Sequence, residues 1–210
     1  IAIRSLVKTG WRVAVSGFEH NAVMRPLYAL GADVRVAGRT LFDWDELLDS
    51  FYKVLCSGVD AAVFTHVSNV FGYILPVAQM AALCRKYKVP FVVDAAQSAG
   101  AIPIDMERMN IGILCLPGHK GLMGPQGTGM LILRGGITLD TLMEGGNGMD
   151  SLRGEMSEDA PERYEAGTLQ TPAIAGLRAG LEFVRSVGVE NIGAHERRLG
   201  TQLRDRLMEL

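Results

Sequence analysis

Few features of this 210-residue sequence favour a nucleic-acid-binding or membrane-spanning protein. Its 21 basic and 23 acidic residues nearly cancel and give a formal net charge of -2, whereas a nucleic-acid binder usually carries a basic patch or stripe. Hydrophobic residues make up 48% of the chain, yet no apolar run is long enough to cross a bilayer. The sequence shows no internal repeat and no low-complexity segment. We therefore predict a globular protein that binds neither nucleic acid nor membrane.

Cysteine is also scarce, with three residues at wide spacing: Cys56, Cys84 and Cys115. An odd, dispersed set of cysteines matches neither a disulfide framework nor a zinc site. Cys84 falls in a helical pattern and Cys115 in a strand pattern, so both are expected to be small buried apolar side chains. This usage indicates a reducing compartment, and we expect a cytoplasmic protein.

Strand and helix patterns alternate through the first two thirds of the chain. The expected strands are 12–15, 33–36, 60–65, 91–93, 111–116 and 128–133, and the expected helices are the end of one over 1–7, then 20–30, 43–54 and 75–87. This alternation predicts a three-layer α/β/α fold built on a mainly parallel sheet.

The pattern changes after residue 133. Glycines punctuate the following stretch, which continues as a polar run over 150–162 and is expected to be a mobile loop. Helices are expected at 171–187 and 191–210. Because the sequence starts at Ile1 and ends inside a helical pattern, we expect a fragment of a longer chain.

A glycine-rich turn over 117–127 joins the last two expected strands and carries Lys120. Its four glycines allow unusual backbone angles and close approach of the backbone to a ligand. A lysine in such a turn is expected to be partly desolvated, which lowers its pKa and suits the amine to Schiff-base chemistry. For this motif alone, a solvated surface lysine is the alternative.

A second candidate group, Asp94, follows the apolar run 91–93, which is typical of a strand buried on both faces. Side chains at the carboxyl ends of parallel strands lie where open α/β sheets bind ligands. His20, Asn69 and Lys120 also follow expected strands, so these side chains are expected to meet at one edge of the sheet. The alternative for Asp94 is an N-cap of a following helix.

Five segments, in order along the chain, resemble the class V aminotransferase family of pyridoxal phosphate (PLP) enzymes of fold type I, and most closely its cysteine desulfurase (NifS-like) branch. The segments are 19–27, 65–72, 93–97, 118–120 and 163–168. The resemblance covers almost the whole chain. It implies a PLP-binding large domain over 1–170, linking helices over 171–210 that lead toward a small domain, and a homodimer with shared active sites.

The resemblance also implies roles for individual side chains. Lys120 would hold the cofactor and move protons at the substrate α-carbon, Asp94 would pair with the pyridinium nitrogen, and His20 would stack on the ring. Four further contacts with the cofactor are implied: Gln97 at the phenolic oxygen, Asn69 beside the ring, His119 on the phosphate side, and Thr168 at the phosphate of the neighbouring subunit.

For some other polar side chains, the sequence indicates roles that do not involve the cofactor. His20 has an alternative as a histidine at a helix N-terminus that is satisfied by backbone groups. His66 is expected to have a structural role under the site, and Arg163 to shape its own loop. His195 is expected at the surface.

Departures from the family pattern bear on cofactor binding. Pro117 stands where the family usually has a serine or threonine that binds the phosphate, and proline offers neither a hydroxyl nor an N–H. We expect cofactor affinity to fall by an order of magnitude or more. The family's phosphate loop, its substrate-carboxylate arginine and its nucleophilic cysteine are expected to lie outside this sequence.

The activity implied by the resemblance is transfer of sulfur from L-cysteine to an enzyme cysteine as a persulfide, with release of L-alanine and with a sulfur-acceptor protein as a further partner. A selenocysteine lyase or another class V aminotransferase is the alternative. A degenerate, non-catalytic homologue stays open because of Pro117, although a scaffold has no need of Lys120, Asp94, Gln97 and His20. A nucleotide-binding domain is disfavoured because no Gly-x-Gly-x-x-Gly follows an early strand.

Overall fold

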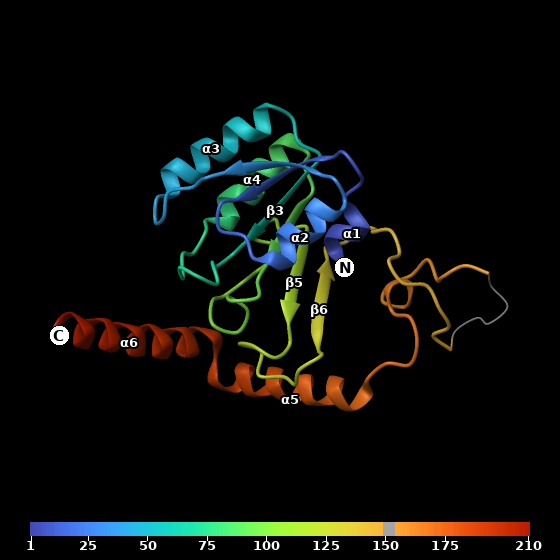
Figure 1. Cartoon of the computed structure of the whole chain (residues 1–210). Helices are drawn as coiled ribbons and strands as arrows, with labels where there is room; N and C mark the ends of the chain where they lie inside the picture. The colour runs from blue at the N-terminus through green and yellow to red at the C-terminus, as the bar shows by residue number, and fades with distance from the viewer. Residues whose placement is uncertain (149–153) are drawn as a thin grey trace.

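The computed structural model describes residues 1–148 and 154–210, and a six-stranded sheet forms its centre (Figure 1). The strands are β1 (Arg12–Ser16), β2 (Asp33–Ala37), β3 (Ala61–Thr65), β4 (Phe91–Asp94), β5 (Ile113–Pro117) and β6 (Gly129–Leu133). The helices are α1 (Ala2–Leu6), α2 (Asn21–Ala29), α3 (Trp44–Cys56), α4 (Val77–Tyr87), α5 (Thr171–Val187) and α6 (Val189–Met208), with a short 3-10 helix, η1 (Glu162–Tyr164).

The strands lie in the order β2-β1-β3-β4-β5-β6. The first five pair in parallel, and β6 pairs antiparallel with β5 from Ile113↔Leu133 to Pro117↔Gly129. The strand order reverses at β1, which has β2 on one side and β3 on the other. A mainly parallel α/β sheet is therefore confirmed.

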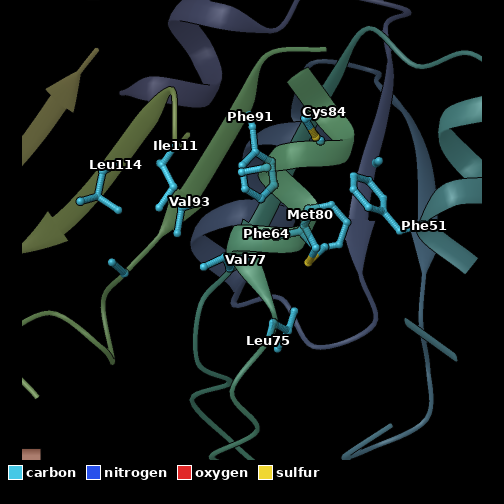
Figure 2. Packing of buried hydrophobic residues seen from close by; sticks show 14 of the residues in the cluster. Phe51, Phe64, Leu75, Val77, Met80, Cys84, Phe91, Val93, Ile111 and Leu114 are labelled. Atoms are coloured by element: carbon cyan, nitrogen blue, oxygen red, sulfur yellow. The ribbon is translucent and has the colours of Figure 1, made fainter. Parts of the chain in front are cut away.

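Helices cover both faces of the sheet because alternate residues of each buried strand point to opposite faces. In β3, Phe64 belongs to the core with α3 and α4, whereas Val63 belongs to the core with α1 and α2. Figure 2 shows the first of these cores, in which Phe51 of α3 meets Phe64 with ring centroids 4.9 Å apart. Cys84 of α4 lies in the same core.

Local sequence explains where the covering helices begin. Asp43 caps α3 by accepting the Glu46 N–H at 2.9 Å, and buried Leu47, Phe51 and Leu55 give α3 one apolar face. Pro76 is the N-cap of α4 rather than a residue of its first turn, which suits a residue with no N–H to donate.

The expected elements are observed, with boundaries that move by one or two residues at most ends. The strand predicted from Ile111 begins at Ile113, and the helix predicted from Asn191 begins at Val189. The predicted loop over 150–162 falls partly on residues 149–153, which lie outside the described residues. The division into a large domain over 1–170 and linking helices over 171–210 stays a prediction.

Cys84 has the burial that the sequence predicts, whereas Cys115 is less buried than expected. Cys84 is buried and Cys115 is half-buried, and burial raises the pKa of each thiol to about 12. Both thiols therefore behave as apolar side chains. In the described part of the chain, no helix is both long and apolar enough to cross a membrane.

Candidate active site

Most of the expected site residues, but not Thr168, lie along one edge of the sheet, at the carboxyl ends of the parallel strands. Asp94 is the last residue of β4, and it is in register with Thr65 of β3 and Cys115 of β5. Lys120 follows β5 by three residues, and Asn69 follows β3 by four. His20 lies between β1 and α2. The sheet topology therefore brings these segments to a common edge.

Two glycines hold the turn of Lys120 against the loop that follows Asp94. A Cβ atom added at Gly100, whose φ is +88°, would lie 2.0 Å from the Gly121 carbonyl oxygen. A Cβ atom added at Gly121 would lie 2.2 Å from the Ala99 carbonyl oxygen. The two loops thus pack backbone against backbone, at a distance that only glycine permits.

Helix α5 supports the same turn from another direction and runs past the ends of β5 and β6 (Figure 1). A Cβ atom at Gly180 would lie 2.4 Å from the Leu122 carbonyl oxygen, and one at Gly124 would lie 2.6 Å from Leu177 Cδ1. Inside the turn, the Met123 N–H donates to the Lys120 carbonyl at 2.9 Å. The backbone that carries Lys120 is therefore fixed by packing and by hydrogen bonding.

The side chains of His119 and Lys120 are nevertheless exposed. The expectation that Lys120 is partly desolvated is wrong for the described chain, and its role as the Schiff-base lysine stays a prediction. The physical reason is that the glycine contacts secure the backbone of the turn without covering the amine. Pro117 is half-buried at the end of β5, and its effect on cofactor affinity stays a prediction.

Asp94 organises the loop after β4 while it remains half-buried. Its Oδ1 atom accepts the Ala96 N–H at 2.9 Å, but residues 96–101 form turns rather than a helix. The helix N-cap alternative is therefore wrong, because Asp94 caps a turn. Further along this loop, Gln97 Nε2 donates to Asn69 Oδ1, which joins the loops after β4 and β3 through two amides.

His20 is the N-cap of α2. Its Nδ1 atom accepts the Ala22 N–H at 3.1 Å, so a neutral imidazole carries its proton on Nε2. For the Nδ1 atom, this hydrogen bond agrees with the alternative that His20 is a helix N-terminal histidine satisfied by backbone groups. The ring is exposed, and a stacking role for it stays a prediction.

Glu19 is a half-buried group for which the sequence predicts no role. Both of its carboxylate oxygens accept the Thr65 N–H, at 2.9 and 3.0 Å, and Oε1 also accepts the Ser16 hydroxyl at 2.5 Å. Burial raises the pKa of Glu19 from 4.5 to about 7, and the nearby charge of Asp94 adds to the rise. The only signal in the sequence was an acidic residue directly before His20.

His66 is buried, with 4% of its surface exposed. Its N–H donates to the Asp94 carbonyl at 2.9 Å, and its Nδ1 atom has no hydrogen-bond partner among the described residues. Burial lowers the pKa of His66 from 6.5 to about 4. These features agree with the structural role expected for it.

Thr168 lies in a different hollow from the other candidates. It lines a pocket of about 400 Å³ together with the stretches 146–148 and 161–162. Arg163 Nε donates to the Leu139 carbonyl at 3.2 Å, which agrees with its expected role in shaping this loop. His195 is exposed on α6, as expected.

The sequence profile of the aminotransferase class-V family matches residues 1–210. The chain belongs to this family. Similar curated proteins include a probable cysteine desulfurase of Pyrococcus abyssi (strain GE5 / Orsay), 30% identical over an alignment of 218 positions that covers 100% of this chain and 54% of the relative. A cysteine desulfurase of Escherichia coli O8 (strain IAI1) is 32% identical over an alignment of 204 positions that covers 93% of this chain and 50% of the relative.

Solved structures agree with this class-V assignment. The apo structure of a cysteine desulfurase from Thermococcus onnurineus NA1 has a TM-score of 0.82 and 28% identity, covering 97% of this chain and 52% of that one. An alanine–glyoxylate aminotransferase from Nostoc sp., 18% identical with a TM-score of 0.73, shares the fold. The class-V chain described here spans about half the length of these relatives.

Family membership implies PLP, and the side chains along this edge fit the ring end of that cofactor. The edge offers a carboxylate for the pyridinium nitrogen in Asp94, an amine in Lys120, and paired amides in Asn69 and Gln97 that can meet a phenolic oxygen. The ring of His20 is an exposed aromatic side chain on the same edge. The donor set of this class-V chain is therefore compatible with PLP.

Proposed function

We propose that the full protein is a PLP-dependent cysteine desulfurase. The observation that carries the proposal is the backbone contact of Gly100 with Gly121, because it holds the Lys120 turn beside the Asp94 loop in a chain similar to desulfurases throughout. The reaction takes sulfur from L-cysteine onto an enzyme thiol, which becomes a persulfide, and releases L-alanine.

In this proposal each side chain has a distinct task. When bound, PLP supplies an electron sink that stabilises negative charge at the substrate α-carbon. Lys120 Nζ binds the cofactor and takes and returns the α-proton, for which its exposed position gives it access. Asp94 keeps a proton on the ring nitrogen. Gln97 and Asn69 would help to hold the ring, and His20 would contact it.

We also infer a homodimer with shared sites and a cytoplasmic location. Thr168 and the pocket beside it lie apart from the Lys120 turn, which suits a residue that serves the neighbouring subunit. His119 would contact the phosphate. A sulfur-acceptor protein would then take the persulfide sulfur.

The test is visible absorption of the full-length protein with added PLP, for the wild type, Lys120→Ala and Lys53→Ala. Lys53 is a matched control, because it is an exposed lysine paired with Asp49 on α3. We expect a cofactor band in the wild type and in Lys53→Ala but not in Lys120→Ala. L-cysteine should then yield alanine and sulfide, with activity falling at least about 1,000-fold in Lys120→Ala.

Two results would contradict this proposal. A wild-type protein without a band at saturating PLP would favour the non-catalytic homologue. Faster turnover of L-selenocysteine or of an amino-group acceptor than of L-cysteine would instead identify another class-V enzyme.

A further inference from the structure

The pairing between β1 and β3 is short. Only Val13↔Ala61 and Ala14↔Ala62 are in register, although both strands continue beyond these pairs. The strand order also reverses here, and a reversal of this kind is where open α/β sheets form a crevice at their carboxyl edge. The N–H of Thr65, near the end of β3, must therefore find an acceptor other than a β1 carbonyl.

The Glu19 carboxylate supplies that acceptor. Its two oxygens lie 2.9 and 3.0 Å from the Thr65 nitrogen, and Oε1 also accepts the Ser16 N–H at 3.3 Å and the Ser16 hydroxyl at 2.5 Å. One side chain thus joins the ends of two strands that do not pair there. The Ser16 hydroxyl oxygen in turn accepts the Phe18 N–H at 3.1 Å, so the whole turn is tied to Glu19.

His20 follows Glu19 directly and begins α2 as its N-cap. Because Glu19 is fixed to β1 and β3, it fixes the point from which the His20 ring leaves the backbone. No other side chain in the described part of the chain accepts a hydrogen bond from the Thr65 N–H.

The carboxyl group of Glu19 faces Ser16 of β1, Thr65 of β3 and the charge of Asp94 on β4. Burial raises its pKa to about 7. As a carboxylate, Glu19 can accept every one of these hydrogen bonds, whereas a protonated carboxyl must donate at one oxygen. A change of protonation therefore requires the N–H and hydroxyl groups around it to rearrange.

We propose that Glu19 is a positioning residue of this site, which replaces strand pairing between β1 and β3 and, by gaining or losing a proton, shifts the turn that presents His20. This inference deepens the proposed function, since it concerns the same site. The role of the carboxyl group itself, however, can be measured without cofactor.

The first experiment follows the backbone amide resonances of Thr65 and Phe18 by NMR from pH 5.5 to 9 in the full-length protein without PLP. Both chemical shifts should show an inflection near pH 7 in the wild type. The acceptor of the Thr65 N–H and the turn that contains Phe18 change together when Glu19 gains or loses a proton. Glu19→Gln, whose amide has one acceptor and one donor like a protonated carboxyl, should remove the inflection.

Glu46→Gln is the matched control. Glu46 Oε2 accepts the N–H groups of Arg39 and Thr40, at 3.3 Å each, beyond the end of the outer strand β2, so it has the same chemistry away from the site. This variant should keep the wild-type inflection. Flat Thr65 and Phe18 resonances in the wild type, or an unchanged inflection in Glu19→Gln, would overturn the proposal.

The second experiment records the visible cofactor band against pH, and this readout rests on the proposed function. Below pH 7, Glu19→Gln should match the wild type, and above pH 7 the two profiles should separate. Glu19→Leu, which leaves the Thr65 N–H without its acceptor, should weaken PLP binding about tenfold, while Glu46→Gln stays within about twofold.

The outcomes of the two experiments are distinguishable. A wild type without a cofactor band contradicts the proposed function, and the Thr65 and Phe18 resonances still decide the role of Glu19. A band whose pH profile is the same in wild type and Glu19→Gln overturns the positioning role and leaves the desulfurase proposal standing.

Discussion

At the scale of single residues, His66 links the stability of this protein to pH. Its pKa is lowered by burial from 6.5 to about 4, so the unfolded chain takes up a proton between these values while the folded chain does not. The contribution of His66 to stability should therefore be fully present above pH 6.5 and fall as the pH drops toward 4. The shift corresponds to at most about 3 kcal/mol of unfolding free energy.

Replacing His66 should remove this dependence. In urea unfolding between pH 4 and 7, His66→Leu should show a smaller loss of stability on acidification than the wild type. His195→Gln is the control, because His195 is exposed on α6, and it should follow the wild type. Parallel curves for the wild type and His66→Leu would contradict the assignment.

How far the sequence predicts these residues depends on how local their contacts are. Lys120 and Asp94 could be placed because each follows an apolar strand in a recognisable segment. The role of Glu19 could not, since its acceptor function depends on Thr65, 46 residues away. The exposure of Lys120 could not be predicted either, because a glycine-rich turn reports on backbone freedom and not on what covers the side chain.

At the scale of elements, the Lys120 turn depends on its glycine contacts. In Gly121→Ala, the added Cβ would lie 2.2 Å from a backbone oxygen of the Asp94 loop, so the two loops must separate. We expect a loss of about 1–3 kcal/mol in unfolding free energy and weaker PLP binding, measured by urea unfolding and cofactor titration.

Gly135→Ala provides the matched control for this change. Gly135 follows β6, and a Cβ atom there would meet nothing within 4 Å. Its stability and cofactor affinity should stay near those of the wild type. Equal effects of the two substitutions would show that the contact with the Asp94 loop does not matter.

The direction of β6 was the part of the sheet that the alternating pattern left undetermined. A parallel neighbour requires a crossover, usually through a helix, whereas antiparallel strands can follow one another directly. The turn between β5 and β6 contains no helix, so β6 returns antiparallel beside β5. The alternating pattern predicts where the strands lie, whereas the direction of β6 depends on the connection between β5 and β6.

At the scale of the whole molecule, α6 extends away from the sheet (Figure 1), and three of its leucine side chains are exposed. Leu199, Leu203 and Leu207 recur every four residues and are 48%, 62% and 60% exposed. Spacing of this kind places them on one helix face, and contiguous exposed apolar surface promotes association.

We therefore expect the 210-residue chain alone to self-associate. In the triple variant Leu199→Gln, Leu203→Gln, Leu207→Gln, the dissociation constant for self-association should rise about tenfold. Sedimentation of the variant and the parent chain measures this change. A triple variant that associates as strongly as the parent chain would show that another surface is responsible.

The short ladder between β1 and β3 has a consequence for cooperativity. Two register pairs join these strands, fewer than at any other junction of the sheet. Sub-global opening therefore has its natural boundary there, between a unit that carries His20 and a unit that carries Asp94 and Lys120. A ligand that binds both units bridges that boundary, so its binding also stabilises the two units against opening apart.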